Sequence, residues 1–132
     1  MKVLVDSSFL MLLVEKPLQD MKVLEEEFGK TQLIVLECVL NELKRLSRIK
    51  SIKRARLAGT ALRFASRLEK IVYNNHKDVD TNIIEYATGN QIPVATIDTE
   101  LKNELRKKSV VVISVRNDRI IIDGSLLLLK KH

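Results

Sequence analysis

Short apolar runs rich in β-branched residues alternate with segments of helical spacing along this chain, and the alternation restricts the folds open to it. The runs lie at 3–5, 33–35, 71–73, 94–96 and 110–113. Parallel strands joined by crossover helices produce such an order, because parallel neighbours cannot be linked by a tight turn. We therefore predict an α/β fold in which helices cover both faces of a parallel sheet.

The segments between these runs predict the helices. Residues 36–46 carry apolar side chains at 36, 39, 40, 43 and 46, which is helical spacing. A further helix is predicted to begin at Ser8, and another to span 20–28 and end at Gly29. Three more are predicted over 54–69, 80–89 and 100–108. Asp123-Gly124, between the apolar runs 120–122 and 126–128, predicts a hairpin turn.

Two aspartates directly follow predicted strands. Asp6 ends the run 2–5 and Asp98 ends the run 93–97. In an open parallel sheet, ligands bind at the carboxyl ends of the strands, where the strand order reverses. Carboxylates there are good ligands for a hard cation such as Mg²⁺ or Mn²⁺. Asp6 and Asp98 are therefore candidate metal ligands.

Two further acids come from predicted helices. Glu42 lies one turn after Cys38 at the edge of an apolar stripe, and Asp80 opens a helix on its apolar face. Asp80 and Asp98 would also serve as helix caps, and Glu42 as a solvated helix residue. Asp6 has no such alternative, because no helix pattern requires an acid there. The four acids taken together favour a shared metal site over four unrelated structural roles.

The length of 132 residues predicts one domain spanning 1–132. No apolar run approaches the ~18 residues of a membrane span, and no signal-peptide cleavage pattern follows Phe9 to Val14. We therefore expect a cytoplasmic protein that does not act at a membrane. The single cysteine, Cys38, excludes an internal disulfide, and the lack of a Cys/His cluster argues against zinc.

Positive charge is concentrated directly after Glu42. The segment from Leu43 to Lys70 holds ten Lys and Arg residues and one acid, Glu69, so it carries +9 in a chain of net charge +6. A run of this kind is often only a solvated helix face. Beside an acidic cluster, it also suits phosphate binding with little reading of sequence. The candidate RNA-binding residues are Arg45, Arg48, Lys50, Lys53, Arg54 and Arg56.

The predicted helix 54–69 carries two apolar stripes. One comprises Leu57, Ala61, Phe64, Leu68 and Ile71, and the other comprises Ala58, Leu62, Ala65 and Val72. Together they exceed the ~100° width that one core contact requires. A deeply buried helix would explain this width. A homodimer with paired helices would explain it equally well.

The chain resembles the PIN domain, a ribonuclease fold shared by VapC toxins and rRNA-processing endonucleases. The matching motifs are Val5-Asp6-Ser7-Ser8, Val39-x-x-Glu42-Leu43, Asp80-x-x-Ile83-Ile84 and Val94-Ala95-Thr96-Ile97-Asp98. The resemblance implies a three-layer α/β/α sandwich with a five-stranded parallel sheet. It also implies a metal-dependent endoribonuclease that uses one or two Mg²⁺ or Mn²⁺ ions.

The resemblance assigns metal binding and catalysis to Asp6, Glu42, Asp80 and Asp98, with supporting hydroxyls at Ser7 and Thr96. Asp78 competes with Asp80 for the third position, although the apolar register favours Asp80. The resemblance leaves two roles open: the toxin of a toxin–antitoxin pair, with an antitoxin partner, or rRNA processing on a pre-ribosomal particle. A catalytically silent RNA-binding module is the alternative function. A phosphoacceptor receiver domain fits poorly, since Ser7 and Ser114 stand where it needs an acid and a lysine.

Overall fold

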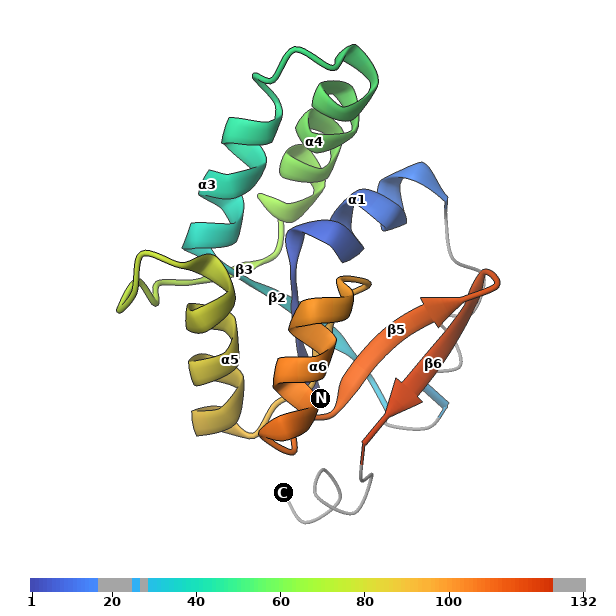
Figure 1. Ribbon diagram of the computed structural model, residues 1–132. Helices are drawn as coiled ribbons and strands as arrows, with labels where there is room; N and C mark the ends of the chain where they lie inside the picture. Colours follow the sequence, from blue (N-terminus) through green and yellow to red (C-terminus); the bar gives the residue numbers. More distant parts are fainter. Residues whose placement is uncertain (17–24, 27–28, 125–132) are drawn as a thin grey trace.

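The computed structural model describes residues 1–16, 25–26 and 29–124 (Figure 1). The predicted helix 20–28 lies mostly outside these residues, and the apolar run 126–128 lies wholly outside them. The described elements are β1 (Lys2–Val5), α1 (Ser7–Glu15), β2 (Gln32–Leu36), α3 (Glu37–Leu46), α4 (Ile52–Ala65), β3 (Glu69–Ile71), α5 (Val79–Asn90), β4 (Val94–Ala95), α6 (Thr99–Lys107), β5 (Val112–Arg116) and β6 (Arg119–Asp123).

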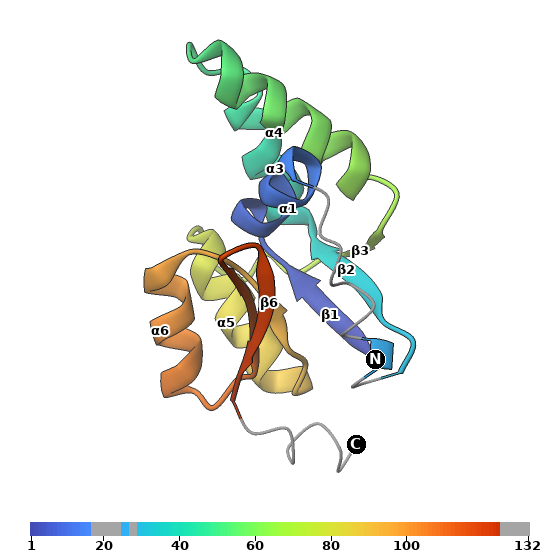
Figure 2. The same ribbon diagram turned by 90° about the vertical axis from the view of Figure 1, so that its right-hand side faces the viewer.

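The sheet has the strand order β3-β2-β1-β4-β5-β6, and its first five strands are parallel. The chain builds outward from β1 through β2 to β3, and then returns to the other side of β1 with β4. The order therefore reverses between β1 and β4. Helices α1, α3 and α4 pack on one face and α5 and α6 on the other, giving three layers (Figure 2). The predicted three-layer fold with five parallel strands is confirmed.

The sixth strand corrects the sequence prediction. β6 pairs antiparallel with β5, so the sheet is mixed. The two strands are joined by Asn117 and Asp118, which have φ of 51° and 62°. Asn and Asp tolerate this left-handed region better than most residues, and tight hairpin turns require it. No turn was predicted at this position. The hairpin predicted at Asp123-Gly124 is a separate one, and its second arm lies outside the described residues.

The core lies between the sheet and its two helical layers. Val3, Leu4 and Val5 are fully buried in the central strand β1. Phe9 and Leu10 of α1 cover one face of the sheet, as do Val39 and Leu43 of α3, while Ile83 and Leu101 cover the other from α5 and α6. Within the described part of the chain, no helix has both the length and the apolar composition needed to cross a bilayer.

Helices α3 and α4 form a hairpin that projects beyond the carboxyl edge of the sheet (Figure 1). Helix α4 packs on α1 and α3, and its alanines Ala58, Ala61 and Ala65 are fully buried. The helix ends at Ala65, before the predicted end at Glu69, and β3 begins at Glu69. Leu68 and Ile71 therefore do not extend a helical stripe, and part of the apolar face belongs to the core.

Candidate functional site

Asp6 stands at the end of β1 and caps the N-terminus of α1, which corrects the expectation that no helix requires this residue. Its Oδ1 accepts a hydrogen bond of 2.9 Å from the backbone N–H of Phe9. The residue is only 5% exposed. Burial raises the pKa of Asp6 from 3.8 to about 6, against the opposing effect of hydrogen bonds from Thr96, Phe9 and Ser8, and the charge of Asp80 raises it further. Burial therefore disfavours the charged form of Asp6.

Two hydroxyls hold the carboxylate of Asp6. Thr96, which follows β4, donates a 2.5 Å bond from Oγ1 to Asp6 Oδ2. Ser8 Oγ lies 2.9 Å from Oδ1 and 3.0 Å from Oδ2 of Asp6. Ser8 Oγ also accepts from the backbone N–H of Ile97 at 3.2 Å, so it ties α1 to the end of β4. Thr96 was named as a supporting hydroxyl from the sequence, whereas Ser8, which makes the second contact, was not.

Glu42 is half-buried on α3 and points toward the start of α1. Ser7 Oγ donates a short hydrogen bond to Glu42 Oε1. Ser7 therefore supports Glu42, while its neighbour Ser8 supports Asp6. In the sequence, the two adjacent hydroxyl residues Ser7 and Ser8 are the feature that could have indicated both hydrogen bonds to the acids. Sequence reasoning assigned a role only to Ser7, because nothing in the sequence shows which carboxylate each hydroxyl meets.

Asp78 and Asp80 have different environments at the start of α5. Asp78 is exposed and caps the helix: its Oδ2 accepts from Thr81 N at 3.0 Å and from Thr81 Oγ1 at 2.6 Å, and these bonds lower its pKa. Asp80 is half-buried in the first turn. Burial raises the pKa of Asp80 to about 6, with further contributions from Asp98, Asp78, Glu42 and Glu100. The geometry thus favours Asp80 over Asp78 as the third acid of the cluster.

Asp98 caps α6 just beyond β4. Its Oδ1 accepts from the backbone N–H of Leu101 at 3.0 Å, and its own N–H donates to Thr96 Oγ1 at 3.1 Å. The side chain is exposed at the carboxyl edge of the sheet. Asp98 is therefore both a cap and a member of the cluster: it is the largest charged contributor to the raised pKa of Asp80.

A groove of about 430 Å³ connects the acids with the basic segment. Glu42 and Asp98 line this groove together with Arg45 and Arg54, while Met11, Leu46 and Ile49 provide apolar lining. The remaining candidate RNA-binding residues are exposed around the tip of the α3–α4 hairpin. We call residues 44–56 the basic hairpin. A second groove of about 430 Å³, between α5 and α6, is acidic: it contains Asp78, Asp80, Glu100 and Glu104.

The sequence model of the PIN-like domain matches residues 3–118. The chain belongs to the PIN-like domain family. Among solved structures, the PIN domain endonuclease Utp24 is similar, with 25% sequence identity, a TM-score of 0.76 and coverage of 94% of this chain and 92% of that chain. A domain of a functionally unknown protein from Methanocaldococcus jannaschii has the same fold at 14% identity, with a TM-score of 0.61 and coverage of 95% and 98%. No curated protein matches the sequence.

The donor set of this PIN-like domain fits a hard divalent cation. Its four acids offer only carboxylate oxygens, which Mg²⁺ and Mn²⁺ prefer. Asp6 and Asp80 have pKa values raised to about 6 by burial and by neighbouring acids, and a bound cation would relieve both effects. In residues 1–16, 25–26 and 29–124, no three acidic, His or Cys side chains are close enough together to form a preformed metal site. Cation binding would therefore draw the carboxylates inward.

Proposed function

We propose that this PIN-like domain is an endoribonuclease that depends on Mg²⁺ or Mn²⁺. The observation that carries the proposal is the placement of the acids at the carboxyl edge of the sheet: Glu42 and Asp98 line one groove, and Thr96 bonds to both the buried Asp6 carboxylate and the backbone N–H of Asp98. The raised pKa values of Asp6 and Asp80 agree with a group of neighbouring acids. Carboxylates whose pKa values are raised by burial and by neighbouring charges are common at functional sites. The similar structure of Utp24 belongs to a protein described as an endonuclease, which supports the same reaction here.

Asp6, Glu42, Asp80 and Asp98 would hold one or two cations. A bound divalent ion would supply a water of lowered pKa and stabilise charge on the leaving oxygen. Thr96 and Ser8 orient the carboxylate of Asp6, and Ser7 orients that of Glu42. These hydroxyls limit the rotation of two of the four acids, Asp6 and Glu42.

The charges around the cluster support RNA as the substrate. Arg45 and Arg54 line the groove that leads to Glu42 and Asp98, so a phosphate held there would lie close to the acids. The groove between α5 and α6 is lined by four acids and would repel a polyanion. RNA therefore approaches across α3 and α4. Both roles expected from the sequence, rRNA processing and a toxin paired with an antitoxin, would act on RNA.

One observation favours the second candidate, a catalytically silent RNA-binding module. No three acids in the described part of the chain are preformed for a metal, whereas the Lys and Arg side chains of the basic hairpin are all exposed. A circular single-stranded RNA separates the two functions, because an endonuclease converts the circle to a linear product and a silent module leaves it circular. The circle has no ends, so a contaminating exonuclease cannot degrade it. We expect Mn²⁺ to promote its conversion to linear products. Binding of the circle without any linear product would favour the silent module.

A further inference from the structure

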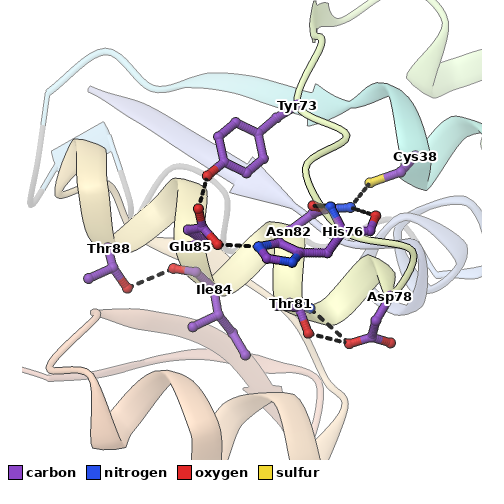
Figure 3. A network of polar contacts seen from close by, with 9 residues as sticks. All are labelled: Cys38, Tyr73, His76, Asp78, Thr81, Asn82, Ile84, Glu85 and Thr88. Carbon is purple, nitrogen blue, oxygen red and sulfur yellow. Dashed lines mark hydrogen bonds and ion pairs between the residues drawn. The ribbon is translucent and has the colours of Figure 1, made fainter.

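Asn82 is a buried amide, 1% exposed, whose side chain reaches two other segments (Figure 3). Its Oδ1 accepts from the backbone N–H of His76 at 3.0 Å, and its Nδ2 donates to the backbone carbonyl of the same residue at 2.9 Å. The Nδ2 also donates to Cys38 Sγ at 3.7 Å. One side chain thus connects α5, the loop that precedes it, and α3.

The two contacts with His76 fix where α5 begins. A side-chain amide that satisfies both backbone groups of one residue holds that residue in position and orientation. The other hydrogen bonds of this segment are more exposed: His76 Nε2 and Tyr73 Oη both bond to the carboxylate of Glu85, although the Tyr73 ring also packs edge-on against Tyr86 (Figure 3). Surface contacts of this type contribute little. Asn82 is therefore the buried tie of the loop.

The contact with Cys38 extends this tie to α3. Cys38 lies one helical turn before Glu42, so the two residues share a face of that helix. Asp80 lies two residues before Asn82 in the first turn of α5. The Asn82–Cys38 contact therefore joins the helix that carries Asp80 to the helix that carries Glu42. A second contact, from Asn74 Nδ2 to Glu37 Oε1 at 3.1 Å, joins the same loop to the start of α3 but is exposed.

We infer that Asn82 is a positioning residue that sets the separation of Asp80 and Glu42 for a shared divalent cation. The inference rests on the proposed function, because it needs those two acids to be ligands. The side-chain hydrogen bonds of Asn82 go to His76 in the loop and to Cys38 on α3 (Figure 3). It acts through the placement of α5 against α3, as residues outside the ligand set do in metal sites.

The test is the Mn²⁺ affinity of the folded protein, measured by titration calorimetry without RNA. Asn82→Ala is expected to weaken Mn²⁺ binding by about tenfold or more, the range typical of residues that support metal ligands. In cleavage assays the same variant should need more Mn²⁺ for half-maximal activity, while its KM for RNA stays unchanged. Excess Mn²⁺ should restore its rate.

Asn90→Ala is the matched control, since it removes another asparagine of α5 whose Nδ2 bonds only to the carbonyl of Tyr86, at 2.8 Å. It should keep wild-type Mn²⁺ affinity. If Asn82→Ala does not fold, Cys38→Ala decides, because it removes only the α3 end of the tie and should weaken Mn²⁺ binding in the same direction. Unchanged Mn²⁺ affinity in a folded Asn82→Ala or, failing that, Cys38→Ala overturns the positioning role. A wild type that binds no Mn²⁺ overturns the proposed metal site itself.

Discussion

Thr96 Oγ1 donates a 2.5 Å hydrogen bond to Asp6 Oδ2 and so joins the ends of β1 and β4, the two strands between which the sheet reverses its order. The bond stabilises the charged form of Asp6. Burial opposes this with a larger effect, because the pKa of Asp6 still rises to about 6. A buried carboxylate lowers the stability of the metal-free protein, because burial disfavours its charged form. Such a carboxylate is typical of a functional site, here a metal ligand.

This balance predicts that the metal-free protein becomes less stable as the pH rises from about 5 to about 7.5. Asp6 and Asp80 have folded pKa values of about 6, above the ordinary aspartate value of 3.8. Between these pH values the folded state binds more protons than the unfolded state, so its free energy of unfolding falls as pH rises. In EDTA, we expect a higher Tm at the lower pH than at the higher one.

Asp6→Asn isolates the contribution of Asp6 to this effect. Asparagine can still cap α1, so the fold should persist. In EDTA at the higher pH, the variant should melt at a higher temperature than the wild type, and its Tm should change less with pH. Added Mn²⁺ should raise the Tm of wild type more than that of the variant. A wild-type Tm that is equal or lower at the lower pH would contradict the assigned pKa shifts.

A second prediction separates Asp80 from Asp78. Asp80→Asn removes a proposed ligand and should abolish Mn²⁺-dependent cleavage. Asp78→Asn keeps a capping side chain for Thr81 N–H, so it should retain both stability and activity. Rates of cleavage for the two purified variants, at equal folded concentration, give the answer. Loss of activity in Asp78→Asn alone would reverse the assignment.

A third prediction concerns the basic hairpin. Reversing Lys50, Lys53, Arg54 and Arg56 to Glu should weaken binding to all RNA sequences alike. The slope of log affinity against log salt should become shallower by roughly 0.7 for each single-strand phosphate that the variant no longer neutralises. The control reverses four exposed basic residues outside the hairpin, which gives the same change in net charge: Lys30, Lys108, Arg116 and Arg119. Equally weakened binding in both variants would show that only net charge matters.

A fourth prediction keeps the homodimer expected from the sequence. In α4, Phe64 is 38% exposed and Leu57 is half-buried, so some of the apolar face remains open after packing on α1 and α3. We expect light scattering after gel filtration to show a dimer that Leu57→Glu/Phe64→Glu converts to folded monomers. A wild type that is monomeric at micromolar concentration would rule the dimer out, and an unfolded double mutant would assign both residues to the core.

The sequence predicted the layers of the fold because period and polarity determine them locally. The run at Val3 to Val5 is fully buried as expected of a central parallel strand. The apolar run 120–122 was expected as a hairpin arm, but its antiparallel pairing with β5 was not predicted, since Asn117 and Asp118 lie beside charged residues and lack the glycine that usually marks a tight hairpin. The early end of α4 was not predicted, because residues 69–71 form a strand that pairs with β2, and that pairing is a tertiary contact.

The candidate site was predictable where a residue's place in its element decides its position. Asp6 and Asp98 follow strands that end at the same edge of the sheet, so topology alone brings them together. Ser8 and Asn82 were not identified, because Ser8 meets Thr96 across 88 residues of sequence and Asn82 meets Cys38 across 44. No local pattern reveals such contacts, and both residue types are common near the starts of helices for local reasons.

The most direct test of the account is cleavage of labelled RNA by the wild type and by folded Asp6→Asn, each with Mn²⁺ and with EDTA. We predict cleavage by the wild type with Mn²⁺ and none in the other three reactions. Cleavage by the wild type in EDTA, or undiminished cleavage by Asp6→Asn with Mn²⁺, would contradict a metal site built on Asp6.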